Sequence, residues 1–226
     1  MVIEGDDVRR ALGNMKNRKA GGCDGLKPEM YKVLLQSEIY VETLRRGPEE
    51  ALIGRREPEE WKKSKTIMIP KTRRPKVSEL RPIALTDVSY KLLMSIEKDK
   101  VERHIEENGM RCEEQAGFTE GGDILDNLVI LQECVRQTFS KKEELVVVAV
   151  DFRKAYDSVR REKIIEILQD FKVPVSLLDL VKRIYCGDQT RIVVERGVVV
   201  VDLESGIRQG CSASTTVFQT YYIKDN

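Results

Sequence analysis

The feature that most constrains the fold is the segment at residues 144–159, ELVVVAVDFRKAYDSV, in which an apolar run ends at an acid. The near-continuous apolar residues from Leu145 to Ala149 are typical of a strand that is covered on both faces. Because a charge inside such a core is very costly, we expect Asp151 at the end of the strand, in reach of water, a cation or a hydrogen-bonded network. The sequence therefore predicts a buried strand that carries a carboxylate to its end.

The carboxylate of Asp151 has two interpretations that the residues alone leave open. A strand-end carboxylate beside a backbone carbonyl suits Mg²⁺, which takes oxygen ligands and keeps positions free for substrate phosphates. The alternative is that Asp151 caps the turn into a helix expected to start near Ser158. Asp157 immediately precedes that helix, so an N-cap or turn hydrogen bond is favoured there over a metal bond.

The composition excludes several classes of protein. The chain has 226 residues, of which 41% are hydrophobic and 34% charged, as expected for one globular domain or slightly more. Its single histidine, His104, and its five scattered cysteines, never spaced as CxxC, argue against a zinc site and against Ser/His/Asp or Cys/His catalysis. We expect reduced thiols in an intracellular protein, in the nucleus or the cytoplasm. No apolar run approaches the ~20 residues of a membrane span.

Charge is distributed unevenly along the chain, although the net charge is only +1. Ten Lys/Arg and four Glu lie between Arg55 and Arg81. Such a stretch is either a solvated loop or a contact surface for nucleic acid phosphates, and charge alone does not decide between them.

The order of the elements predicts a mixed α+β fold, with helices packed against a mainly antiparallel sheet. A first helix with Asp6 or Asp7 as its N-cap is followed by helices after Pro28 and Pro174, around residues 124–139, after Asp151 and at the C-terminal end. Helical spacing predicts three inner faces: Ile124, Leu128, Leu131 and Val135; Ile164, Ile165, Leu168 and Phe171; and Leu177, Leu178, Val181 and Ile184. A short strand ends at Pro70, and residues 190–204 are typical of a β-hairpin with its turn at Arg196 and Gly197. Residues 45–60 carry little information.

Two classes of chemistry use an aspartate placed like Asp151. A phosphoacceptor also needs an acidic pair after an earlier strand, but EGDD at residues 4–7 precedes a helix. Two-metal nucleotidyl transfer needs carboxylates for Mg²⁺, cationic and polar groups for a triphosphate, and a means of testing the sugar. The basic stretch, the aromatic ring of Tyr156 and the glycine-flanked Gln209 are suitable parts for the second class.

Five segments, in order along nearly the whole chain, resemble the reverse transcriptases of non-LTR (LINE-type) retrotransposons. They are KNRKAGGCDGLKPEMYK, IMIPK with LRPIALTDVSYKLL, EEQAGFTEGGDILDNLVIL, VVAVDFRKAYDSVRREKIIEIL and GIRQGCSASTTVFQTYYIKD. The resemblance implies the fingers and partial palm of a right-hand polymerase. Residues 1–143 would form a fingers-like region with an N-terminal extension, and residues 144–226 would form the partial palm, without a thumb.

The resemblance also implies a metal site and a site for the incoming dNTP. Asp151 would be the first catalytic carboxylate and bind both Mg²⁺ ions, with the Phe152 carbonyl as a further ligand. Lys71 and Arg81 would clamp the triphosphate, which suits the bidentate geometry of arginine. The backbone amides of Lys154 and Ala155 would contact the phosphates.

Three further residues would contact the nucleotide on the sugar and base side. Tyr156 matches an aromatic ring that packs under the deoxyribose and excludes a 2′-hydroxyl, although it could instead be a core residue. Gln209 would lie against the nucleotide near its sugar. Gly210 would keep the backbone close to the nascent base pair, as glycine permits.

The chain departs from the family pattern in four places. Tyr156 stands where phenylalanine is usual, CSAS replaces Cys-Pro-Leu-Ser, and AGGCDG replaces Pro-Gly-Pro-Asp-Gly. The Tyr-x-Asp-Asp motif that supplies the remaining carboxylate is absent from these 226 residues.

We therefore expect a fragment of an RNA-directed DNA polymerase that uses an RNA template, a DNA primer, dNTPs and Mg²⁺, and that does not polymerise by itself. The alternatives are a catalytically silent RNA-binding module and a remnant of a decaying retroelement.

Overall fold

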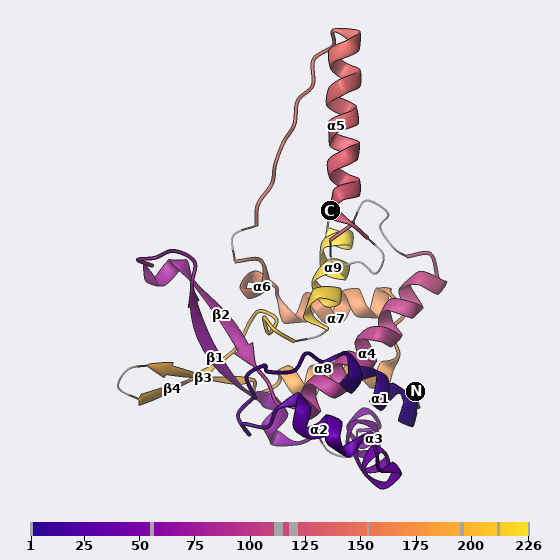
Figure 1. Cartoon of the computed structure of the whole chain (residues 1–226), viewed down its shortest axis with the longest axis vertical. Helices are drawn as coiled ribbons and strands as arrows, with labels where there is room; N and C mark the ends of the chain where they lie inside the picture. The colour runs from indigo at the N-terminus through magenta and orange to yellow at the C-terminus, as the bar shows by residue number, and fades with distance from the viewer. Residues whose placement is uncertain are drawn as a thin grey trace.

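The computed structural model describes residues 2–54, 57–110, 115–117, 122–152, 154–194, 197–211 and 213–225, with the backbone alone at residue 78 and over 220–225. Of the three N-terminal helices, α1 (Gly5–Asn14) and α3 (Glu38–Leu52) pack against the long helix α4 (Val88–Glu107), and α2 (Pro28–Leu34) packs against α1. They form the lower part of the view in Figure 1.

The start of α1 and the extent of α3 differ from what the sequence predicts. The cap of α1 is Glu4 rather than Asp6 or Asp7, and its backbone N–H donates to the Asp7 carboxylate at 3.0 Å. Helix α3 runs through the stretch that the sequence left undefined, with Pro48 inside the helix and Val41 on its buried face. Burial of that apolar face outweighs the local helix-breaking signal of the proline.

The sheet has four strands in the order β2-β1-β3-β4. Strand β1 (Lys63–Pro70) pairs antiparallel with β2 (Leu80–Leu85) and parallel with β3 (Gln189–Val194), and β3 pairs antiparallel with β4 (Gly197–Asp202). The mixed α+β class and the predicted hairpin are confirmed, with Gly197 opening β4 and Arg196 outside the described residues. Short 3₁₀ turns, η1 (Glu59–Lys62) and η2 (Val77–Glu79), precede β1 and β2.

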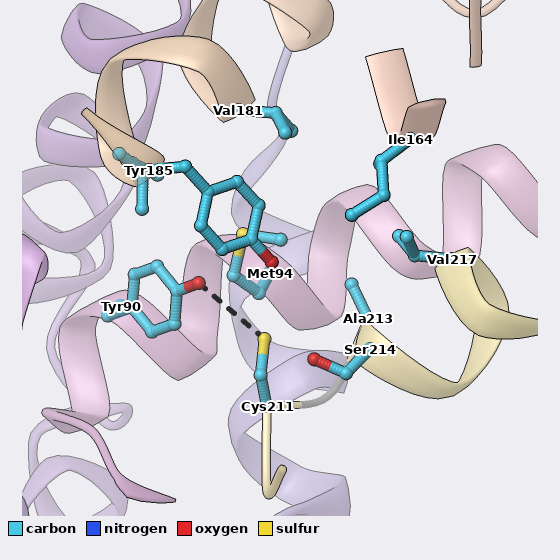
Figure 2. A pocket seen from close by; sticks show the side chains of 10 residues that line it. Tyr90, Met94, Ile164, Val181, Tyr185, Cys211, Ala213, Ser214 and Val217 are labelled. Carbon is cyan, nitrogen blue, oxygen red and sulfur yellow. Dashed lines mark hydrogen bonds between the residues drawn. The ribbon is translucent and has the colours of Figure 1, made fainter. Parts of the chain in front are cut away.

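A second helical layer joins α7 (Arg161–Asp170), α8 (Val175–Tyr185) and α9 (Ser214–Asp225) to α4. The predicted inner faces are confirmed at Ile164 and Leu168 of α7 and throughout α8, while Ile165 is only partly buried. Figure 2 shows side chains of all four helices meeting beside the loop that precedes α9.

The predicted strand at residues 145–149 is wrong for this chain. Residues 143–152 are extended but belong to no strand, and Val146 and Val148 are 84% and 78% exposed. A strand exists only beside a hydrogen-bonding neighbour, and every described strand pairs within the β2-β1-β3-β4 sheet. The segment instead runs back along α5 (Ile124–Lys141), which projects from the body (Figure 1).

Helix α5 itself is confirmed where the sequence predicted it. Its expected inner face, Ile124, Leu128, Leu131 and Val135, is exposed in the described structure. Periodicity therefore identified the helix and its apolar stripe but not what the stripe contacts.

Glu97 of α4 is buried without a hydrogen bond to either carboxylate oxygen in the described structure. Burial raises the pKa of Glu97 to about 7, and the Lys100 ammonium, 3.6 Å from Oε1, only partly offsets this. Because the pKa is higher in the folded than in the unfolded chain, the stabilising contribution is fully present below pH 4.5 and is lost as pH rises to about 7.

We therefore expect Glu97→Gln to raise the free energy of unfolding by on the order of 3 kcal/mol at pH 8, with no gain at pH 4. Urea denaturation at both pH values measures this difference. Glu107→Gln, an exposed change on the same helix, should alter stability by no more than about 0.5 kcal/mol at either pH. An equal effect of Glu97→Gln at the two pH values would contradict the expectation.

Candidate nucleotide-binding site

The loop at residues 203–211, which contains the Arg-Gln-Gly sequence, joins three separate parts of the chain. The Gly206 N–H donates to the Val159 carbonyl at 2.8 Å, and the Ile207 N–H donates to the Tyr156 carbonyl at 3.0 Å. On its other side the Gln209 carbonyl accepts the Ala84 N–H of β2 at 2.8 Å. The loop thus fixes the segment that follows Asp151 against the sheet.

Gly210 makes this close approach to β2 feasible. Its φ of +114° lies in the region that favours glycine, and a Cβ there would be 2.8 Å from the Ala84 carbonyl oxygen. The adjoining Gln209 is half-buried and lines a cavity of about 300 Å³ between the loop and the sheet. Met68, Pro82 and Ile192 form the sheet side of this cavity.

The short helix α6 (Ala155–Ser158) carries Tyr156 into this arrangement. Lys154 precedes it with a left-handed φ of 54°, and its carbonyl accepts the N–H groups of Asp157 and Ser158. Asp157 therefore lies inside α6 rather than capping the next helix, and α7 begins only at Arg161 after Arg160. The N-cap expected at Asp157 does not form, because the chain after Asp151 makes a helical turn of its own, in which the Asp157 N–H donates to the Lys154 carbonyl.

The ring of Tyr156 is stacked on Phe218 of α9, with the centroids 5.0 Å apart and the planes at 23°. The side chain is half-buried against the core, and this burial raises the pKa of its hydroxyl. Its contact with Phe218 agrees with a core role for the ring. The predicted test of the sugar by Tyr156 stays a prediction.

Lys71 and Arg81 lie at the far end of the β1–β2 hairpin, where Pro70 pairs with Leu80. Both side chains are exposed, as are those of Arg73, Arg74 and Lys76 in the connecting turn. In contrast, Lys62 is held by Glu59 and Glu57 at 3.3 and 3.6 Å. The hairpin tip is therefore the most exposed described part of the basic stretch, since Lys63 and Lys65 of β1 are half-buried and Arg55 and Arg56 lie outside the described residues.

Asp151 and Phe152 lie on the exposed extended segment, not in the packed site. Over the described ranges no three His, Cys, Asp or Glu residues are grouped as a metal site would need. The structure therefore gathers Tyr156, Gln209 and Gly210 around one loop, and it does not gather further carboxylates around Asp151. Lys154 and Ala155 adjoin Tyr156 at the start of α6.

Sequence reasoning missed the charged residues that hold this loop. Asp188, just before β3, accepts from Arg161 at 2.6 Å and from two nitrogens of Arg208 at 2.6 and 3.1 Å. The Asp188 and Arg208 side chains are 0% and 1% exposed. The available signal was an arginine directly beside Gln209 and an acid in the glycine-containing turn CGDQ.

Comparison with known proteins identifies the family. The model of the family described as "Reverse transcriptase (RNA-dependent DNA polymerase)" matches residues 69–224, which include the hairpin, α6 and the Arg-Gln-Gly loop. The chain belongs to the reverse transcriptase family. The resemblance to reverse transcriptases of non-LTR retrotransposons is confirmed by its relatives.

Two relatives show how much of a longer protein this chain matches. It is 25% identical over 165 residues to the retrovirus-related Pol polyprotein from type-1 retrotransposable element R2 of Nasonia vitripennis, covering 71% of this reverse transcriptase chain. It is 21% identical over 221 residues to the transposon TX1 uncharacterized 149 kDa protein of Xenopus laevis, covering 94% of the chain. The chain spans 16% of the length of each relative.

None of the described helices of this reverse transcriptase chain combines the length and the apolar character that crossing a bilayer requires.

We expect Gly210→Ala to lower the free energy of unfolding by about 1–3 kcal/mol, because it adds a clash with the Ala84 carbonyl and strains the backbone. Urea denaturation measures the loss. Gly47→Ala is the control, since a Cβ inside α3 meets open space and should stabilise by up to about 1 kcal/mol. Equal effects of the two substitutions would refute the close approach.

Proposed function

We propose that this chain is the fingers and partial palm of an RNA-directed DNA polymerase that adds dNTPs to a DNA 3′ end on an RNA template. The observation that carries the proposal is the hydrogen-bonded junction of the Arg-Gln-Gly loop with α6 and β2. It brings together residues that the family resemblance assigns to one nucleotide. The basic tip of the β1–β2 hairpin extends from the same strands.

Each part of this site has a distinct task in the proposed reaction. Lys71 and Arg81 would bind the triphosphate, whose negative charge matches the exposed cations of the hairpin. The backbone at Lys154 and Ala155 would donate to phosphate oxygens. Gln209 and Tyr156 would orient the sugar, so that its 3′ side faces the primer end.

Reverse transcriptases in general use divalent metal ions. From this chain the Asp151 carboxylate and the Phe152 carbonyl would serve as ligands, and the metal would activate the 3′-hydroxyl and stabilise the leaving pyrophosphate. The described residues fit this role only in part, because they offer no grouped set of carboxylates. One aspartate cannot hold two Mg²⁺ in the geometry of polymerisation, so the 226 residues alone should not extend a primer.

A second function is supported by the difference between the hairpin tip and the surroundings of Asp151. The hairpin tip presents exposed cations, whereas Asp151 belongs to no group of three or more possible metal ligands among the described residues. A polymerase-derived module that binds RNA and performs no chemistry would need only the first feature. The two functions differ in what Asp151 does.

In a protein that continues through a Tyr-x-Asp-Asp motif, Asp151→Ala should abolish primer extension on an RNA template and change RNA affinity less than about twofold. The control is Asp179→Ala, an exposed change in α8 that should retain extension. Gel assays of extension and filter binding measure both. Extension by the Asp151→Ala protein would contradict the catalytic role of Asp151, whereas RNA binding without extension by the unsubstituted protein would favour the RNA-binding module.

RNA affinity should fall steeply with salt, because contacts to phosphates release counterions. Substituting Gln for Arg73, Arg74 and Lys76 together should reduce the slope of log affinity against log salt by about 2, roughly 0.7 for each lost contact. Fluorescence anisotropy with a single-stranded RNA measures the slope. Substituting Gln for Lys141, Lys142 and Lys172 removes equal charge elsewhere, and an equal loss of slope there would contradict the assignment to the hairpin.

A further inference from the structure

Two arginines meet one buried carboxylate beneath the proposed nucleotide site. Arg208 uses its third nitrogen to donate to the Trp61 carbonyl at 2.6 Å and lies over the Tyr90 ring, 5.0 Å from its centroid. Arg161 donates to the Gly206 carbonyl at 3.1 Å and also to the Leu203 carbonyl. Both of these Arg161 bonds end on the 203–211 loop, and Arg208 is itself a residue of that loop.

The bonds of Asp188 connect the two ends of that loop. Arg161 binds its first turn at Leu203 and Gly206, and Arg208 is itself part of the loop, next to Gln209. The Asp188 carbonyl also accepts the Leu203 N–H at 2.8 Å. The loop is therefore fixed at its start and near its nucleotide-facing end by the same residue.

We propose that Asp188, acting through Arg161 and Arg208, is the positioning residue that holds Gln209 and Gly210 in place for the incoming nucleotide. The proposal rests on the proposed function for the identity of the ligand. It does not rest on that function for the loop's conformation, which the structure shows directly. Asp188 is not a catalytic residue, because it is fully buried and touches no reacting atom.

The energetics of buried charge make this role specific to Asp188. Removal of its charge leaves two guanidiniums without their shared carboxylate in an environment that excludes water, a strongly unfavourable state. Arg208 can regain solvation only if it moves outward, and it carries Gln209 and Gly210 with it. Loss of Asp188 should therefore open the loop locally before the helices unfold.

Cys211 reports such an opening, because it lies at the end of the loop and is buried. Figure 2 shows its thiol directed at the Tyr90 hydroxyl, 3.7 Å away, among side chains of α4, α8 and α9. Its N–H donates to the Arg208 carbonyl at 3.2 Å. Cys23, Cys134 and Cys186 are exposed, so they serve as internal references for a thiol reagent.

The test compares Asp188→Asn with a matched control, Glu57→Gln, in the 226-residue chain. Glu57 accepts from Arg183 at 2.9 Å, so the control likewise takes the negative charge away from an arginine, but at a contact that does not involve residues 203–211. The rate at which iodoacetamide alkylates each cysteine is followed by mass spectrometry. Each variant is measured at the same number of degrees below its own Tm. Binding of dTTP with MgCl₂ is measured by equilibrium dialysis on the same proteins.

We expect Asp188→Asn to accelerate alkylation of Cys211 by about tenfold or more, with the three exposed cysteines unchanged, and to weaken dTTP binding in parallel. Glu57→Gln should alter neither quantity. Should Asp188→Asn fail to fold, Arg208→Lys replaces it. Lysine keeps the charge but cannot bridge Asp188 and the Trp61 carbonyl together, so Cys211 should again react faster.

An unchanged Cys211 rate in a folded Asp188→Asn or Arg208→Lys chain overturns the proposal. An equal acceleration of Cys211 alkylation in Glu57→Gln also overturns it, because Asp188 would then contribute only to the general stability of the fold. Failure of the unsubstituted chain to bind dTTP counts against the proposed function of this chain instead. In that case the Cys211 rates still decide whether Asp188 positions the loop.

Discussion

The carboxylate of Asp188, buried between the guanidiniums of Arg161 and Arg208, is the interaction that the arrangement of the site depends on. A buried charge is tolerated only where its partners and the remaining hydrogen bonds are all supplied. Here the partners come from the start of α7 and from the Arg-Gln-Gly loop, and Arg208 extends the network to Trp61 of η1. If one of these elements moved without the others, a buried charged side chain would lose its ion-pair partner.

The sheet also joins parts that are far apart in the chain, and it does so through neutral groups. The parallel pairing of β1 with β3 joins residues far apart in the chain, and Thr190 links the two strands through hydroxyl contacts to Ser64 and Thr66 at 3.1 and 2.7 Å. Because β3 follows residue 143 and β1 precedes it, the sheet is shared by the two regions expected from the sequence. The Arg-Gln-Gly loop then docks on β2 at the edge of that shared sheet.

Prediction from sequence succeeded where the signal was local. The proline that starts α8 and the β-branched residues on both sides of the turn at Arg196 and Gly197 were sufficient to place those elements. It failed where the deciding contact was distant: α3 forms despite Pro48 because its apolar face is covered by other helices. Asp188 gave no local signal of its role, since its partners lie 27 residues before and 20 residues after it.

The segment that ends at Asp151 shows the same difference between local sequence signals and distant contacts, here inside the proposed active site. Its valines have the composition of a strand covered on both faces, yet their side chains are exposed, since pairing is a property of a neighbour and not of the segment. The loop that carries Gln209 is held by a buried ion network, whereas no packed strand fixes the position of Asp151. The loop on the proposed nucleotide side is thus held in place by contacts within this chain, whereas the proposed metal side requires contacts that the described residues do not make.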